Sequence, residues 1–185
     1  NKKLSSKEIS AGARHGKRGG HRALKHNGRL GLPSEQEEGV ESTANLLLQL
    51  KKTTPGLHFT LGVSTFVPKA HTPFQWQGVR PEADKRLKRL GKRLKPKGID
   101  LRPESYGWSV IQALLSRSDR RLAPVIVAVR GTQESLGGWK KAYRAARAGE
   151  LPAAKSAGVE LPLPPAWEQV IHEIWPDDTV LPWSH

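Results

Sequence analysis

The clearest pattern in the chain is the alternation of apolar and polar residues between positions 57 and 67. Aromatic and β-branched residues are frequent in this segment, which predicts a β-strand. The segments 34–52 and 81–97 on either side instead carry apolar residues at helical spacing. Gly98 ends the second of these helices, and a short strand is expected over 99–102. Helices and strands that alternate with short connections predict an α/β fold with a parallel sheet.

The N-terminal part of the chain is harder to interpret. Residues 6–18 are expected to form a basic helix, and a strand would fit over residues 23–32. Asn27-Gly28, in the middle of that segment, is however typical of a turn. After the segment, Ser34 and Glu37 have the spacing of a capping box, which predicts a helix that opens at Pro33-Ser34.

Beyond residue 105 the pattern becomes mostly helical. Trp108, Ile111 and Leu115 fall on one face of a predicted helix, and Ser105 is positioned to cap it. Two further helices are expected, one containing Leu122, Val125, Ile126 and Val129 and one containing Trp139, Ala142, Tyr143 and Ala146. Residues 125–129 taken alone would also fit a strand. Residues 149–165 are rich in proline and are expected to form a linker, and residues 166–175 a last short helix.

The composition narrows the chemistry that this chain can perform. It has 185 residues, enough for one domain with a sizeable core, and it contains no Met, which favours a piece of a longer protein. Cys is also absent, so the chain supplies no disulfide, no thiolate nucleophile and no thiolate ligand for a metal cluster. The seven His residues have no convincing metal-site spacing. No apolar run is long enough for a membrane span, and we expect a cytoplasmic protein.

The charge of the chain is strongly basic. The net charge is +14 and the isoelectric point about 10.4, with the basic residues concentrated in segments 2–29 and 85–97. Such a balance favours a polyanionic partner, and a nucleic acid is one candidate. The alternative is a solvated outer helix face on an α/β domain, since no aromatic signature of RNA binding accompanies the charges.

Polar and loop residues follow the predicted strands at the edge where ligands of parallel α/β folds bind. Gly31-Leu32-Pro33-Ser34 leads into a predicted helix N-terminus, which can accept an anion or a polar ligand edge. The alternative is that these residues only form a tight turn. Residues 64–68 end the next strand, and His71 in the loop beyond is a candidate acid, base or substrate contact. The competing interpretation packs His71 between Pro68 and Trp76.

A second cluster, Ser116 to Arg121, places three arginines around one aspartate. Arginines in such a cluster can clamp a phosphate or a carboxylate. The alternative, which we favour, is a helix junction in which Asp119 caps the next helix and the arginines are solvated or ion-paired.

These segments resemble radical S-adenosylmethionine (radical SAM) enzymes. Gly31-Leu32-Pro33-Ser34-Glu35 resembles the Gly-Leu-Pro-Gly-Glu segment after the fifth barrel strand of those enzymes. Residues 63–76 resemble the sixth strand and following loop of the subgroup that carries an N-terminal cobalamin-binding-type domain. The Ser116–Arg121 cluster and residues 181–185 are similar to later parts of the same subgroup. The resemblance runs from about residue 30 to residue 185 and is weak over 1–29.

The resemblance implies the second half of a (β/α) barrel over residues 1–104, a helical post-barrel region over 105–148, and a Pro-rich linker with a short helix over 149–185. It implies S-adenosylmethionine at the carboxyl ends of the strands and a 4Fe–4S cluster held by a Cys-x-x-x-Cys-x-x-Cys loop upstream of this chain. Cobalamin in the complete protein stays open. The S-adenosylmethionine side would be formed by Gly31, Leu32, Pro33 and Ser34, and the substrate side by Ser64, Thr65, Phe66, Pro68, His71 and Thr72.

No residue of this chain is thereby a catalytic residue or a metal ligand, and we expect the chain alone to be inactive. Its expected partner is the missing N-terminal half of the enzyme. Two other hypotheses remain at this point. One is a basic nucleic-acid-binding module, and the other is a non-catalytic remnant whose strand edges and apolar faces are exposed.

Overall fold

The computed structural model describes residues 4–130, 134–151 and 165–184. The chain divides into two compact units. The first unit comprises residues 1–65 and 81–104, and the second comprises residues 66–80 and 105–185. Residues 66–80, which follow the second strand, therefore belong to the same unit as the C-terminal helices.

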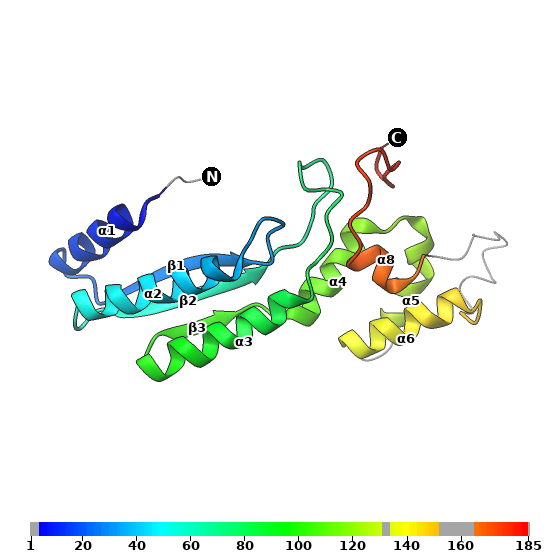
Figure 1. The fold of residues 1–185 in the computed structure, drawn as a ribbon. Helices are drawn as coiled ribbons and strands as arrows, with labels where there is room; N and C mark the ends of the chain where they lie inside the picture. Colours follow the sequence, from blue (N-terminus) through cyan, green and yellow to red (C-terminus); the bar gives the residue numbers. More distant parts are fainter. Residues whose placement is uncertain (1–3, 131–133, 152–164, 185) are drawn as a thin grey trace. The chain divides into compact units, whose positions relative to one another are not determined.

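The first unit is a three-stranded parallel sheet with helices in the connections (Figure 1). Its strands lie in the order β1-β2-β3, as in the chain, which confirms the α/β class and the parallel sheet. In chain order the elements are α1 (Ser6–Arg18), β1 (Ala23–Leu30), α2 (Glu37–Thr53), β2 (His58–Thr65), α3 (Glu82–Leu94), a 3-10 turn (Lys95–Lys97) and β3 (Asp100–Pro103).

The two faces of this sheet differ in character. Phe59, Leu61 and Val63 of β2 are buried on the face against which α2 and α3 pack. Leu101 of β3 pairs with Leu61 and lies against Gly91 of α3. The opposite face is polar, and its β1 and β3 side chains are exposed, namely Lys25, Asn27, Arg29, Asp100 and Arg102. Helices in the described part of this unit thus cover one face of a sheet whose other face is hydrophilic.

The segment around Asn27-Gly28 is a strand and not a turn. All eight residues of β1 pair with β2 in one continuous parallel register. Asn27 pairs with Gly62 on the polar face, and a Cβ atom at Gly62 would lie 2.9 Å from the Asn27 side-chain oxygen. The local turn propensity is overridden because the neighbouring strand provides backbone partners and a glycine opposite Asn27.

The helix predicted to open at Pro33-Ser34 begins instead at Glu37, with Gln36 as its N-cap and without a side-chain capping bond. The predicted Ser34–Glu37 capping box is therefore wrong. The carboxylate of Glu37 bonds to Arg86, and that of Glu35 accepts from the backbone N–H of Gly31. These longer-range bonds hold residues 31–36 as a loop that separates β1 from α2.

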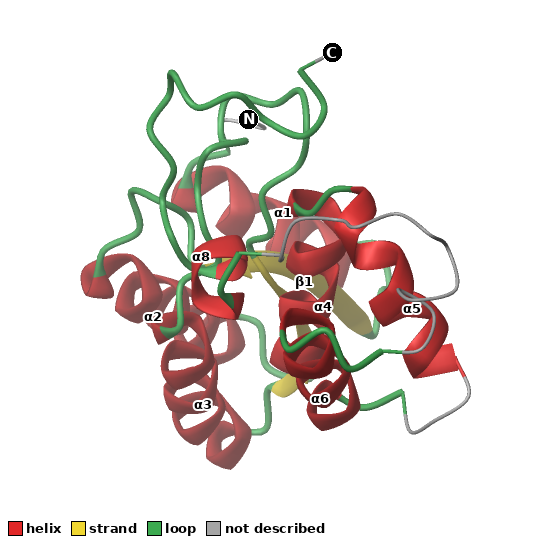
Figure 2. Ribbon diagram, turned by 90° about the vertical axis from the view of Figure 1, so that its right-hand side faces the viewer, coloured by secondary structure: helices red, strands yellow, loops and turns green. Residues whose placement is uncertain are grey.

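The second unit is mainly helical (Figure 2). Its helices confirm the three expected between residues 105 and 148, and residues 125–129 are helical. The final helix is shorter than the expected 166–175, and the predicted linker falls largely on residues 152–164, outside the described residues. The elements are α4 (Tyr106–Arg117), a 3-10 turn (Arg120–Leu122), α5 (Ala123–Arg130), α6 (Leu136–Arg147) and α8 (Trp167–Ile171).

The buried face of α4 coincides only in part with the one that the spacing indicated. Ser105 caps the helix as predicted, by accepting the N–H of Trp108. Trp108 and Leu115, however, are 54% and 49% exposed. Ile111 is buried as predicted, and Val110 and Leu114 join it in one core cluster with residues of α5, α6 and α8. The helix is apolar over a wide arc, so its neighbours determine which part of that arc is buried.

No helix in the described part of the chain is both long enough and apolar enough to cross a membrane.

Candidate functional site

The first candidate site lies at the carboxyl edge of the sheet in the first unit. Leu30 and Thr65, the last residues of β1 and β2, pair with each other, and Arg29 pairs with Ser64. The predicted residues Ser64 and Thr65 therefore lie beside the strand end from which residues 31–34 continue. Backbone and side-chain polar groups converge at this edge, as in ligand-binding parallel α/β folds.

The loop after β1 has a defined conformation. Gly31 is buried and has a φ of +81°, a region that side-chain-bearing residues rarely adopt. Its N–H donates to the Glu35 carboxylate at 2.8 Å. The N–H of Glu35 in turn donates to the carbonyl oxygen of Leu32 at 3.0 Å. The loop is closed on itself by these two bonds, which leaves Leu32 and Pro33 half-buried and Ser34 exposed.

Arg86 of α3 holds this loop in place through ion pairs with two glutamates. Its guanidinium donates to Glu35 at 2.8 Å and to Glu37 at 2.7 Å. The side chains of Arg86 and Glu35 are each only 11% exposed, so this pair is shielded from water and salt. The hydrogen bond from Arg86 lowers the pKa of Glu37, and the bonds to the carboxylates raise the pKa of Arg86. Both charges therefore persist at neutral pH and hold the loop against α3.

The polar face of the sheet, next to this edge, carries several basic side chains. Lys25 and Arg29 project from β1, and Arg102 from β3 bonds to Asp100 at 2.7 Å. Thr60 and Ser64 of β2 lie between these strands and are half-buried. Such a surface suits a polar or anionic ligand far better than an apolar one.

The other predicted substrate-side residues belong to the second unit. Phe66 and Pro68 are buried; the Phe66 ring meets Phe74 edge-on, with centroids 5.7 Å apart. His71 is exposed and has a φ of +56°, so the interpretation of a His packed between Pro68 and Trp76 is wrong. The hydroxyl of Thr72 donates to the carbonyl oxygen of Lys69 at 2.8 Å.

The loop that holds these residues is tied to the C-terminal segment. The N–H of Val79 donates to Ile171 and that of Trp175 to Trp76, both at 2.8 Å. The indole N–H of Trp183 donates to the side-chain oxygen of Gln75 at 3.0 Å. Residues about a hundred positions apart in the chain therefore shape this loop, a relationship that no local pattern indicates.

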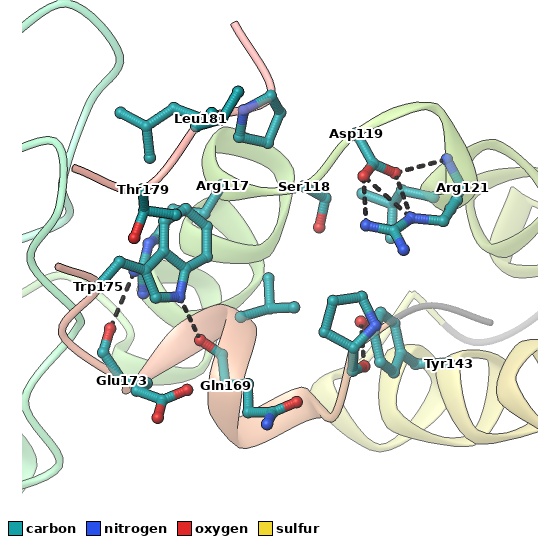
Figure 3. Close-up of a pocket in the computed structure, with 15 residues that line it drawn as sticks. Arg117, Ser118, Asp119, Arg121, Tyr143, Gln169, Glu173, Trp175, Thr179 and Leu181 are labelled. Carbon is teal, nitrogen blue, oxygen red and sulfur yellow. Dashed lines mark hydrogen bonds and ion pairs between the residues drawn. The ribbon is translucent and has the colours of Figure 1, made fainter. Parts of the chain in front are cut away.

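A pocket in the second unit was missed by sequence reasoning (Figure 3). It has a volume of about 400 Å³ and combines apolar walls with a few polar groups. Residues from α4, α6, α8 and the C-terminal loop line it, among them Arg117, Ser118, Asp119, Tyr143, Gln169 and Trp175. Pockets of this size hold small molecules in other proteins.

The Ser116–Arg121 cluster forms one wall of this pocket. Asp119 caps the following 3-10 turn by accepting the N–H of Arg121 at 2.9 Å, which confirms the junction hypothesis for that residue. The Arg121 side chain returns to the Asp119 carboxylate, with a shortest distance of 2.5 Å. This pair lowers the pKa of Asp119. Asp119 and Arg121 therefore neutralise each other at the pocket wall.

Arg117 departs from the expectation of a solvated or ion-paired arginine, since it is only 1% exposed. Its Nη2 donates to the backbone oxygen of Glu173 at 2.9 Å, and its guanidinium lies 3.9 Å from the centre of the Trp175 ring. Burial lowers the pKa of Arg117 to about 10, an effect that the negative charge of Glu173 partly offsets. The signal in the sequence was the helical spacing of Arg117 from Val110 and Leu114.

The basic helix α3 is partly neutralised within the first unit. Arg86, Arg89 and Arg93 form ion pairs with acids on or just before α2, namely Glu35, Glu37 and Glu41. These arginines therefore contribute less to a free polyanion-binding surface than the sequence suggested. The described residues also contain no group of three or more His, Cys, Asp or Glu side chains that could hold a metal ion.

Comparisons with known proteins identify one partial relative. Over 94 residues the chain is 30% identical to an uncharacterised protein of Methanocaldococcus jannaschii. The matched region covers 51% of this chain and 21% of that relative, so the chain spans about a fifth of the relative's length. No family model matches the chain, and no solved structure matches it significantly.

Proposed function

We propose that this chain is the C-terminal part of a radical SAM enzyme of unknown substrate, and that its cluster-binding half lies outside this chain. In this proposal the first unit is the second half of a (β/α) barrel. The observation that carries the proposal is a sequentially ordered parallel sheet with helices on one face and polar side chains on the other.

Helices on one face of the sheet support a barrel because parallel sheets in open α/β folds have helices on both faces. In a (β/α) barrel, by contrast, helices cover the outside only and the ligand lies at the carboxyl ends of the strands. Strand β1 pairs with β2 alone among the described strands, so its other edge is available for a preceding strand. The missing N-terminal half of the enzyme is the partner that would supply this strand.

The residues at the strand ends are compatible with S-adenosylmethionine. Leu32 offers apolar surface, Ser34 offers an exposed hydroxyl, and Gly31 brings the main chain close to the edge of the sheet. Gly31, Leu32, Pro33 and Ser34 would contact the nucleoside, whereas Ser64 and Thr65 would face the substrate.

The iron–sulfur cluster does not fit this chain, which contains no Cys. We therefore assign no chemical step to these residues and expect the chain alone to be inactive. In the complete enzyme the cluster would supply the electron for reductive cleavage of S-adenosylmethionine. Cobalamin, if it is used, would likewise be held by the upstream part. The match to about a fifth of a longer archaeal protein agrees with a chain that is one part of a longer protein.

The test is the mass and iron content of the native protein, captured from its source organism with an antibody raised against these 185 residues. A markedly longer polypeptide that carries iron and acid-labile sulfide supports the proposal. A product of 20.4 kDa without iron rejects it and leaves the binding module or the non-catalytic remnant. Capture with an antibody raised against an unrelated protein gives the background for the iron measurement.

A pair of glycine variants in the longer native protein tests the assigned loop. Gly31→Ala places a side chain at a φ of +81°, and Gly20→Ala does so at +82°, in the exposed turn after α1. Both variants carry the same kind of backbone strain. We expect Gly31→Ala to weaken S-adenosylmethionine binding in equilibrium dialysis, and Gly20→Ala to leave it unchanged. Equal affinities for both variants would remove the loop from the binding site.

The alternative hypothesis of a nucleic-acid partner can be distinguished by how binding depends on the salt concentration. Binding through phosphates weakens steeply as the salt concentration rises. Because Arg86, Arg89 and Arg93 are ion-paired, the charges that remain for this role are exposed basic residues of α1 and α3, among them Arg14, Lys17, Arg18, Lys85 and Lys92. Steeply salt-dependent RNA or DNA binding that these arginines and lysines control would favour the basic module over the enzyme fragment.

A further inference from the structure

The pocket of the second unit contains a buried cation for which the described residues provide little compensation. Nε and Nη1 of Arg117 are buried and have no hydrogen-bond partner among the described residues. Its one hydrogen bond is to a backbone carbonyl, and its face is covered by an indole ring. A buried guanidinium with unmet donors is costly, and side-chain carboxylates usually satisfy it.

The acids nearby do not fill this role. Asp119 is bonded to Arg121, and Glu173 contributes its backbone oxygen to Arg117 while its carboxylate attracts the guanidinium only at longer range. Figure 3 shows the Glu173 carboxylate directed away from Arg117. No side-chain carboxylate among the described residues therefore bonds to the positive charge next to the pocket.

The other residues that line the pocket indicate the size and polarity of an anion that could bind there. Apolar side chains dominate, including Leu122, Val170 and Leu181, and the Trp175 and Tyr143 rings add flat surface. The volume of about 400 Å³ suits a small organic molecule rather than a bare ion. Ser118 points into this space between Trp175 and the Asp119–Arg121 pair (Figure 3).

From this arrangement we propose that the pocket binds a small organic anion, with an apolar body against its walls and one carboxylate or phosphate group paired with Arg117. The Trp175 indole, which stacks on the guanidinium, is the side chain that turns to admit the anionic group. The Arg121–Asp119 pair stays intact and forms the neighbouring polar wall. This site lies within the second unit and does not depend on the proposed radical SAM function.

Isothermal titration of the 185-residue chain with three six-carbon probes tests the proposal. Hexanoate carries a carboxylate, hexyl phosphate a phosphate and hexanol no charge. We expect at least one of the two anions to bind more tightly than hexanol, and the preferred anion identifies the ligand class. Equal binding of all three, or no binding of either anion, overturns the proposal.

Two arginine variants separate the pocket from general attraction to a basic chain. Arg117→Met removes the buried charge, and Arg120→Met removes an exposed charge three residues away. Loss of one charge-assisted hydrogen bond weakens binding about tenfold or more, which we expect for Arg117→Met only. Equal affinities for the two variants would show that the anion binds elsewhere.

A third variant keeps the test decisive if Arg117→Met does not fold. Ser118→Phe leaves the arginine in place and fills the pocket with a ring. We expect it to abolish binding of the preferred anion. Retained affinity in a folded Ser118→Phe chain would overturn the proposal.

Discussion

Gly78 lies directly against the main chain of His172, so closely that a Cβ atom at residue 78 would be 2.5 Å from the His172 carbonyl carbon. The two segments are hydrogen-bonded next to this contact, through Val79 to Ile171 and through His172 Nδ1 to the Val79 oxygen at 2.7 Å. The loop after β2 is thus anchored to the C-terminal helix by an approach that only glycine permits.

Replacing this glycine should therefore unfold the second unit more easily. We expect Gly78→Ala to lower the free energy of unfolding by about 1–3 kcal/mol, the usual cost of overpacking a site that cannot yield. Urea unfolding followed by tryptophan fluorescence measures this change. Gly39→Ala is the matched control, since nothing lies within 4 Å of its added methyl group, and alanine should stabilise α2 there. A Gly78→Ala chain as stable as the wild type would contradict the close approach.

Arg86 should matter more than its neighbour Arg89, although both pair with Glu37. Arg86→Met leaves the shielded Glu35 carboxylate without its cation, and we expect it to cost about 1–3 kcal/mol of folding free energy. Arg89 is 54% exposed, so Arg89→Met should change stability less. Chemical unfolding of the two variants in parallel checks this order. Equal losses would mean that the Arg86–Glu35 pair does not hold the loop after β1.

His26 predicts a loss of stability in mild acid. Its ring stacks on Phe59, with centroids 6.0 Å apart, and burial lowers the pKa of His26 because the charged imidazole is disfavoured. The unfolded chain, with a His pKa of about 6.5, then binds the proton first. Stability should be complete above about pH 6.5 and decline as the pH falls through the lower pKa of the folded state.

The measurement for His26 is thermal unfolding at a series of pH values. His26→Leu should flatten this acid decline relative to the wild-type chain. An unchanged slope in the His26→Leu chain would show that His26 is not the group that takes up the proton.

Tyr143 predicts the opposite behaviour at high pH. Its hydroxyl donates to the carbonyl oxygen of Pro165 at 2.9 Å, and burial raises the pKa of Tyr143 to about 12. Because the unfolded pKa is about 10, the stability tied to the neutral hydroxyl is present below pH 10. It is lost as the pH rises through the higher pKa of the folded state.

Absorbance titration of tyrosinate tests this assignment, since the chain has only two tyrosines. Tyr143→Phe should remove the ionisation step near pH 12 and cost about 0.5–1.5 kcal/mol at neutral pH through the lost hydrogen bond. If Tyr143 ionised near pH 10, like a tyrosine of the unfolded chain, this result would contradict its burial.

Much of the fold could be predicted because it is encoded in short-range patterns. The alternation over 57–67 predicted β2, and the helical spacing over 81–97 predicted α3 and the 3-10 turn after it, which ends at Gly98 in a left-handed conformation. Ser105 caps α4 because its hydroxyl needs only a backbone N–H three residues away. The candidate strand ends followed from the same patterns, since parallel strands bring their carboxyl ends to one edge.

Other features depended on partners that are distant in the chain. Asn27-Gly28 extends into β1 only because β2 pairs with it, and the loop at Gly31–Ser34 is held through Glu35 by Arg86, 51 residues away. The pocket around Arg117 could not be predicted for the same reason. Its guanidinium is bonded to Glu173, 56 residues further on.

The sequence alone thus determined the order of helices and strands, the parallel α/β class of the first unit, and the lack of thiolate ligands in this chain. These features follow from local periodicity and from composition, which do not depend on contacts between distant parts of the chain. The tertiary structure decided which face of α4 is buried, how the loop after β1 is held, and that Arg117 lies inside a pocket. Burial depends on which surfaces meet, and residues far apart in the chain provide those surfaces.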